Sequence, residues 1–182
     1  MSVVYVTADW HLGHTNVAKR REGTCKHCVP YQEHDEFILE SYREVVRPRD
    51  IVWFLGDIIM DRKYLEVVAD LPGTKHLVLG NHDVAPDSLV KDIHVSDLTK
   101  VFTHITGLVR YKDTWLSHAP MHPCELRGKV NLHGHMHSQI VGDPCYINCC
   151  VEHTEFVPMS FQKLRPIIDA GKEYASKLYP RS

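Results

Sequence analysis

The chain lacks the features that mark membrane, fibrous and disordered proteins. No apolar run in its 182 residues approaches the roughly 20 residues that a spanning helix needs, so we expect no membrane segment. Repeats, linkers and low-complexity stretches are absent as well. With 43% hydrophobic and 24% charged residues, the composition is that of a globular protein. The length fits one domain, which we expect to cover residues 1–182.

The sequence also has no excess of one charge. Its formal net charge of −2 gives no general attraction to nucleic acid or to an anionic membrane, so neither is the expected partner. Residues 1–10 have no basic leader and only a short apolar stretch, unlike a secretory signal. We therefore expect a cytoplasmic protein whose six cysteines, at positions 25, 28, 124, 145, 149 and 150, are reduced thiols. Nothing in the sequence points to an oligomeric state.

Histidine, in contrast, is abundant, at 14 of 182 residues, and much of it lies in short motifs that recur along the chain. Each motif follows an apolar run that predicts a buried strand. The motifs are Asp9-Trp10-His11, Gly56-Asp57, Gly80-Asn81-His82-Asp83, His118 and Gly134-His135-Met136-His137. Ligands gather beyond the carboxyl ends of strands in such sheets, so all the motifs are expected at one cleft. Together they supply enough oxygen and imidazole donors to bind two metal ions. A single ion would not need so many.

The first two motifs suggest how a metal could be held. Asp9 and His11 are two residues apart, so on a continuing strand both side chains would point to one face and could bind one divalent cation. Gly56 permits a sharp turn, and Asp57 directly after a buried strand needs positive charge nearby. If Asp57 lay between two metal cations, both cations would supply this positive charge.

The later motifs add neutral ligands. Asn81 offers a carbonyl oxygen, His82 is free to face a substrate, and Asp83 could orient the His82 ring. Two histidines two apart, His135 and His137, can point at different metals if the chain turns at Gly134. Each motif alone has a structural alternative, a turn or, for His118, a packed core histidine. All of these alternatives would have to hold together for the site to be absent.

This ordered set resembles the calcineurin-like metallophosphoesterase superfamily, whose pattern is D-x-H, G-D, G-N-H-D/E, H and G-H-x-H. The opening at 9–17 and, more loosely, the stretch at 146–152 are similar to small single-domain members from bacteria and phages. The resemblance implies one metal on Asp9, His11 and His137, a second on Asn81, His118 and His135, and Asp57 bridging the two. It also implies that His82 acts beside the phosphate as catalytic acid or charge stabiliser, and that His14 touches the substrate or a group behind it.

The expected fold is α/β, with two mixed β-sheets packed as a sandwich and flanked by helices in four layers. The expected activity is hydrolysis of phosphate esters by attack of a metal-bound hydroxide, with two divalent ions drawn from Mn, Fe, Ni, Co and Zn. A chain of 182 residues has little room for a cap domain. An open cleft would then admit a phosphodiester as readily as a monoester. The resemblance to small members implies a phosphodiesterase on small or nucleotide-like esters, with a phosphomonoesterase as the alternative.

Two further alternatives stay open. A nuclease could use the basic runs 19–21 and 47–49 on phosphates, although the overall charge is acidic. A scaffold without catalysis is the other, although scaffolds of this superfamily have typically lost metal ligands.

The element Cys25-Lys26-His27-Cys28 falls outside the family pattern. It could be half of a zinc site completed by Cys145, Cys149 or Cys150, but exposed thiols are the favoured reading.

Periodicity gives the expected elements. Strands are predicted at 2–7, 51–55, 75–79, 100–111, 113–117, 129–133 and near 145–151. Helices are predicted at 33–47, at 61–71 with Asp61 as N-cap, at 86–92, and at 160–178 entered at Ser160. Residues 14–32 are predicted to be a polar, basic loop.

Overall fold

The computed structural model describes residues 1–23, 29–83 and 93–179, and within them the strands form two sheets. The first sheet has the order β4-β3-β2-β1-β9 and is parallel except for β9. Its strands are β1 (Val4–Thr7), β2 (Ile51–Phe54), β3 (Thr74–Val78), β4 (His104–Thr106) and β9 (Met159–Ser160). Four of its strands thus present their carboxyl ends at one edge.

The second sheet has the order β5-β6-β7-β8, with β5 antiparallel to β6 and the other pairs parallel. Its strands are β5 (Leu108–Tyr111), β6 (Thr114–Ser117), β7 (Val130–His133) and β8 (Tyr146–Asn148). Both sheets are therefore mixed, as expected.

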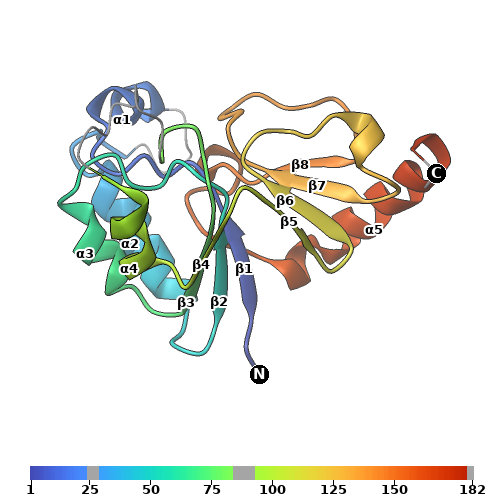
Figure 1. Ribbon diagram of the computed structural model, residues 1–182. Coiled ribbons are helices and arrows are strands. Elements are labelled where there is room, and N and C mark those ends of the chain that lie inside the picture. Colours follow the sequence, from blue (N-terminus) through green and yellow to red (C-terminus); the bar gives the residue numbers. More distant parts are fainter. Residues whose placement is uncertain (24–28, 84–92, 180–182) are drawn as a thin grey trace.

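Helices flank the sheets (Figure 1). They are α1 (Thr15–Arg21), α2 (His34–Val45), α3 (Tyr64–Ala69), α4 (Val95–Val101) and α5 (Phe161–Leu178), with short 3-10 turns η1 (Pro123–Glu125) and η2 (Val151–His153). In the view of Figure 1, α1 to α4 lie on the side of the first sheet, and α5 runs along the second sheet. Among the described residues, no helix is long and apolar enough to cross a membrane.

Two hydrophobic clusters hold these layers together. One lies between the first sheet and its helices, where the rings of Trp10, Tyr42 and Phe54 contact one another with centroids 5.1 to 6.0 Å apart. The other joins the sheets, with Val6 and Leu55 of the first packed against Leu116 and Leu132 of the second, and α5 adds its own apolar residues. The predicted fold class, a sandwich of two mixed sheets flanked by helices, is confirmed.

Most element predictions hold to within a few residues, and two are wrong. The predicted loop at 14–32 contains helix α1, which sequence periodicity missed because its buried residues are only Val17, Ala18 and Arg21. The predicted strand at 100–111 is instead the end of α4 followed by β4 and β5, which belong to different sheets. The chain crosses from one sheet to the other at Gly107.

Helix boundaries are the remaining differences. Helix α3 begins at Tyr64 with Lys63 as N-cap, and Asp61 Oδ1 accepts a hydrogen bond from Lys63 N at 3.0 Å. The N-cap of α5 is Ser160 as predicted, its hydroxyl accepting from Lys163 N at 3.2 Å. The predicted helix at 86–92 and the Cys25-x-x-Cys28 element lie outside the described residues.

Candidate metal centre

The first motif does not lie on a continuing strand, as its spacing suggested. Strand β1 ends at Thr7, and both Asp9 and His11 take left-handed backbone angles, with φ of 58° and 52°. Their amides bond to the loop after β2, Asp9 N to Gly56 O and His11 N to Asp57 O, each at 3.0 Å. The two side chains still come together, with His11 Nε2 3.6 Å from Asp9 Oδ1, while the Trp10 side chain between them is fully buried in the core of the first sheet.

The left-handed backbone recurs through the other motifs. Asp57, His135 and His137 have φ values of 55°, 67° and 47°. Such angles are uncommon for residues with a β-carbon and cost about 1 kcal/mol each. They concentrate at functional sites, where the surrounding structure holds the strain.

Glycines allow the carboxylates to approach the backbone. A β-carbon at Gly134 would overlap Asp9 Oδ2, and one at Gly80 would overlap Asp57 Oδ1. Glycine is thus required at these two positions because a carboxylate lies against the backbone there, and turn geometry is not the main reason.

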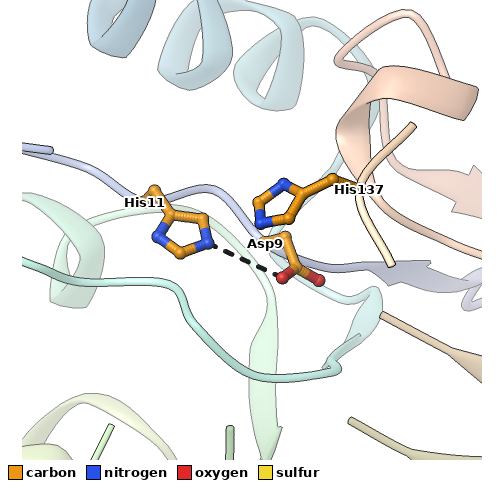
Figure 2. Close-up of side chains that lie close together, drawn as sticks. All are labelled: Asp9, His11 and His137. Carbon is orange, nitrogen blue, oxygen red and sulfur yellow. Dashed lines mark ion pairs between the residues drawn. The ribbon is translucent and has the colours of Figure 1, made fainter. Parts of the chain in front are cut away.

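Asp9, His11 and His137 form the first cluster of ligand-type atoms (Figure 2). One atom from each lies within 4.8 Å of the others, and His11 Nε2 is 3.6 Å from Asp9 Oδ1. Both of those atoms are buried without a hydrogen-bond partner. Burial also lowers the pKa of His11, which favours the neutral imidazole that metals bind.

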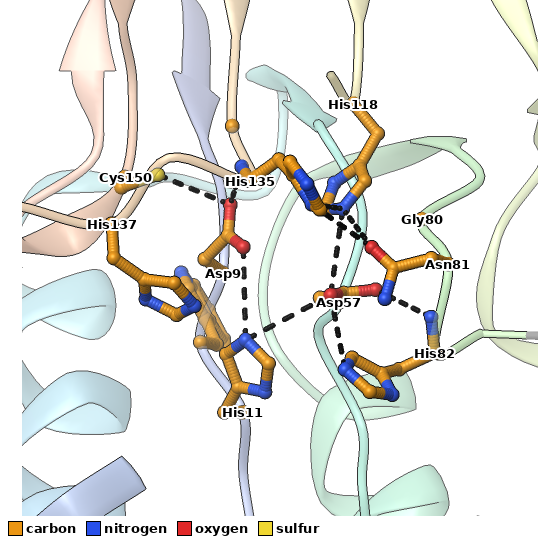
Figure 3. Close-up of polar contacts among 12 residues, drawn as sticks. Asp9, His11, Asp57, Gly80, Asn81, His82, His118, His135, His137 and Cys150 are labelled. Atoms are coloured by element: carbon orange, nitrogen blue, oxygen red, sulfur yellow. Dashed lines mark hydrogen bonds and ion pairs between the residues drawn. The ribbon is translucent and has the colours of Figure 1, made fainter. Parts of the chain in front are cut away.

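Asn81, His118 and His135 form the second cluster (Figure 3). Asn81 Oδ1 lies 2.8 Å from His118 Nε2 and 3.0 Å from His135 Nδ1, and the two ring nitrogens are 3.2 Å apart. His118 Nδ1 donates to Leu55 O at 2.8 Å, so Nε2 is the nitrogen that faces the cluster and is placed to bind a metal. Three donor atoms therefore point at one small volume.

Asp57 joins the two clusters. Its Oδ2 lies 3.8 Å from His11 Nε2 and 3.4 Å from His118 Nε2, while Oδ1 accepts from His82 N at 2.8 Å. A second grouping of ligand-type atoms, Asp9, Asp57 and His118, also fits within 4.8 Å. The clusters are thus contiguous, with the Asp57 carboxylate in the position that a bridging ligand would take.

The buried carboxylates favour positive charge between them. Burial lowers the pKa of His118, but Asp57 beside it and the charge of Asp9 outweigh burial and raise that pKa to about 9. For Asp57, burial raises the pKa, and His118 outweighs it, so the net shift is downward. A metal cation would supply the same charge, and oxygen with imidazole donors suits Mn, Fe, Co, Ni or Zn.

The side chains expected to face a substrate lie on the open side of the centre. His82 is 30% exposed, with Nε2 4.0 Å from Asp57 Oδ2, and its ring is 5.7 Å from that of His11. The His14 ring is 5.8 Å from the same His11 ring. Both predicted positions are therefore beside the clusters.

The expectation that Asp83 orients the His82 ring is not met. Its Oδ2 accepts hydrogen bonds from Gly80 N at 2.6 Å and Asp57 N at 3.1 Å, and Oδ1 faces Ile58 N at 3.5 Å. Asp83 thereby ties the loop after β3 to the loop after β2. Its part in the site is to fix the backbone that carries Asp57.

Sequence reasoning missed a buried ion pair behind the first cluster. The sequence predicts that Arg21 lies in a polar, basic loop, but it is only 4% exposed and donates to the carbonyl oxygens of Asp9 and Trp10 at 2.6 and 3.1 Å. It also pairs with Glu152 at 2.8 Å, and Glu152 Oε1 lies 2.8 Å from His137 Nδ1. A carboxylate on Nδ1 turns the Nε2 of His137 towards the cluster, as carboxylates do behind metal-binding histidines.

The buried cysteines have separate partners. Cys150 Sγ donates to Asp9 Oδ2 at 3.2 Å, where His135 N also donates at 2.8 Å. Cys145 and Cys149 contact backbone carbonyl oxygens instead. Asp9 Oδ2 is thus held by two donors, and its Oδ1 is the oxygen directed at His11.

Comparison with known proteins gives relatives whose names state no activity. No family model matches the chain. An uncharacterized protein of Methanocaldococcus jannaschii is 23% identical over 184 residues, covering 94% of each chain. A crystal structure of a protein of unknown function from Aquifex aeolicus matches with a TM-score of 0.68 at 24% identity, covering 92% of this chain and all of that one, which supports the fold alone.

Two phage proteins are more similar in sequence. The gene 66 proteins of mycobacteriophages L5 and D29 are each 31% identical over 171 residues. The matches cover 78% of this chain and 80% and 81% of the two relatives. The chain therefore belongs to the family of the mycobacteriophage gene 66 proteins.

Proposed function

We propose that this chain is a phosphoesterase that depends on two divalent metal ions, and that it acts mainly on phosphodiesters of small or nucleotide-like compounds. One observation carries the proposal. Ligand-type side chains from separate strand ends meet in two contiguous clusters that share Asp57, with buried Asp9 Oδ1 and His11 Nε2 lacking any hydrogen-bond partner. Burying such atoms is costly unless a charge satisfies them.

The residues divide between two cations. Asp9, His11 and His137 would hold one ion, Asn81, His118 and His135 the other, and Asp57 both. Ions of this kind supply Lewis acidity towards phosphate oxygens and make water in the cleft more acidic. The chain itself contributes the fixed geometry, because Glu152, Cys150 and the loop amides hold the ligands in place.

His82 is the proposed proton donor. The backbone N–H of His82 donates to Asp57 Oδ1, which fixes the backbone of His82. The His82 side chain stays partly exposed to the cleft. From there the ring can donate an N–H to a phosphate oxygen in the transition state or to the leaving oxygen. His14 forms the adjoining wall and would contact the ester group of the substrate.

A pair of substitutions tests these roles separately. Asp57→Asn should lose both metals and nearly all activity, whereas His82→Ala should keep the metals and lose roughly 10²- to 10⁴-fold in turnover, the range for a general acid. Metal content is measured by elemental analysis after loading with Mn²⁺ or Ni²⁺ and desalting. Turnover is measured with bis(p-nitrophenyl) phosphate and with the monoester, so that the diester preference is tested in the same assay.

Controls keep the same chemical changes away from the centre. Asp70→Asn and His104→Ala alter exposed residues and should retain both metals and activity. Hydrolysis that persists after complete chelation would reject the metal-dependent mechanism. A fully active or metal-free His82→Ala would reject the role of His82.

A further inference from the structure

A cavity of about 420 Å³ adjoins the metal centre on the side of the first cluster. Its wall includes Val17 and Arg20 of α1, His137 and Ser138 from the loop after β7, and His153 of η2. His137 belongs both to this wall and to the first cluster, so the cavity lies next to the centre. Its volume lies in the usual range for a small-molecule site, about 300–1,000 Å³.

The cavity carries a net positive charge at neutral pH. Arg21 and Glu152 both line it, but they pair with each other at 2.8 Å, so their charges cancel. Arg20 is exposed, and within the described part of the chain no carboxylate lies within ion-pair distance of it. Among the described residues, the Arg20 guanidinium therefore faces the cavity without a paired carboxylate, beside the proposed metal centre. A guanidinium is well suited to binding phosphate.

A smaller cavity on the other side of α1 offers a different environment. It has a volume of about 220 Å³ and is lined by His14, Tyr31, Lys63, Tyr64 and the carboxylate of Asp35. Asp35 accepts hydrogen bonds from Gly13 N and from the His34 ring, and despite its burial these partners keep its pKa below the usual value. Lys63 in this wall pairs with Asp61 at 3.2 Å, so the charge of Asp35 remains and a second anionic group is better placed at Arg20.

We propose that the Arg20 cavity binds a second phosphate of the substrate, on the part of a nucleotide-like diester that lies away from the scissile phosphorus. Val17 offers an apolar surface for the sugar or base. His153 Nε2 lies 2.8 Å from His137 O, which fixes its ring in the wall. The substrate class is thus a nucleotide diester that carries a further phosphate, such as a terminally phosphorylated dinucleotide. This inference rests on the proposed phosphoesterase function.

Binding to the metal-free protein tests the cavity independently of catalysis. With EDTA present, thymidine 5′-monophosphate should bind in titration calorimetry and thymidine should not. Arg20→Gln should weaken the nucleotide about tenfold, the size expected for one partly exposed charged hydrogen bond. Arg110→Gln is the matched control, since Arg110 is exposed on the distant strand β5, and it should bind as the unmodified protein does.

Kinetics test the specificity. In the Mn²⁺-loaded protein, kcat/KM should be about tenfold higher for a thymidine dinucleotide with a terminal phosphate than for one without, and Arg20→Gln should bring that ratio close to one. Equal values in the unmodified protein, or equal effects of Arg20→Gln and Arg110→Gln on binding, would overturn the proposal. Failure to cleave any diester, with nucleotide binding still dependent on Arg20, would instead reject the phosphoesterase function and leave the phosphate site standing.

Discussion

Glu152 lies between Arg21 and His137, and replacing it with glutamine removes one buried negative charge without changing its size. Its carboxylate is 2.8 Å from Arg21 Nε and 2.8 Å from His137 Nδ1, and the side chain is 11% exposed. Burial raises the pKa of Glu152, but the His137 hydrogen bond and the Arg21 charge outweigh it, and the pKa falls to about 2. The substitution therefore removes a carboxylate that pairs with the buried Arg21 guanidinium.

Two routes give the size of the loss. A carboxyl with a pKa about 2 when folded and 4.5 when unfolded contributes on the order of 3 kcal/mol to the free energy of unfolding at pH 7. Removing one partner of a buried ion pair costs about 3–5 kcal/mol, which agrees. For a domain of this length, roughly 2–4 °C per kcal/mol gives a fall in Tm of about 6–12 °C.

Thermal unfolding followed by circular dichroism in EDTA measures this loss, with Glu36→Gln as control. Glu36 is 63% exposed and pairs with Arg43 at 3.1 Å, so its replacement should cost no more than about 1 kcal/mol. Because the folded pKa of Glu152 is depressed, its contribution is present above about pH 5 and disappears as the pH falls towards 2. The curves for the unmodified protein and Glu152→Gln should therefore converge in acid.

An outcome in which Glu152→Gln and Glu36→Gln lower Tm equally at pH 7 would refute this reasoning. So would a difference that stays constant down to pH 2. A second readout concerns the metal. Because Glu152 turns the His137 ring, the variant should bind Mn²⁺ about 10- to 100-fold more weakly, the usual effect of removing a carboxylate behind a metal-binding histidine.

Two further substitutions probe the contacts of Asp9. Gly134→Ala should destabilise the protein by about 1–3 kcal/mol in denaturant unfolding and weaken Mn²⁺ binding, because the added β-carbon overlaps Asp9 Oδ2. Gly142→Ala is the control: a β-carbon there meets nothing within 4 Å, so neither stability nor Mn²⁺ affinity should change. Equal effects of the two substitutions would contradict the assigned contact. Cys150→Ala should weaken Mn²⁺ binding several-fold by removing a donor to Asp9 Oδ2, and Cys150→Ser should restore it. Cys149→Ala removes an equally buried thiol and should leave Mn²⁺ affinity unchanged; a parallel loss in both alanine variants would show that packing, and not the hydrogen bond, is responsible.

The motif positions could be predicted because their signals are local. An apolar run followed by a glycine or polar residue defines a buried strand and its end within about ten residues, as at 51–57 and 130–135. Parallel pairing brings such ends to one edge within each sheet, as for β1, β2 and β3 in the first sheet and β6 and β7 in the second. Packing of the two sheets then brings the ligand-type residues of both edges together. The structure gathers all seven predicted ligands in this way.

What surrounds the ligands could not be predicted because it depends on contacts between distant residues. Arg21 and Glu152 are 131 residues apart, and a basic triplet at 19–21 reads as surface until the fold buries its last member. Asp83 looked like a partner for its neighbour His82, but its oxygens reach the amide of Asp57, 26 residues away. Local spacing therefore predicts the ligand-type residues more readily than the residues that hold those ligands in place.

The left-handed backbone of the ligands gives a last reason to treat the centre as functional. Asp9, His11, Asp57, His135 and His137 together store about 5 kcal/mol of strain, as much as the entire stability of a weakly stable domain. Asn or Gly at these positions would relieve part of it, since both accept such angles more readily. The buried ion pair and the inter-loop amide bonds offset this strain, and that combination is expected where five side chains must face one another in a fixed arrangement.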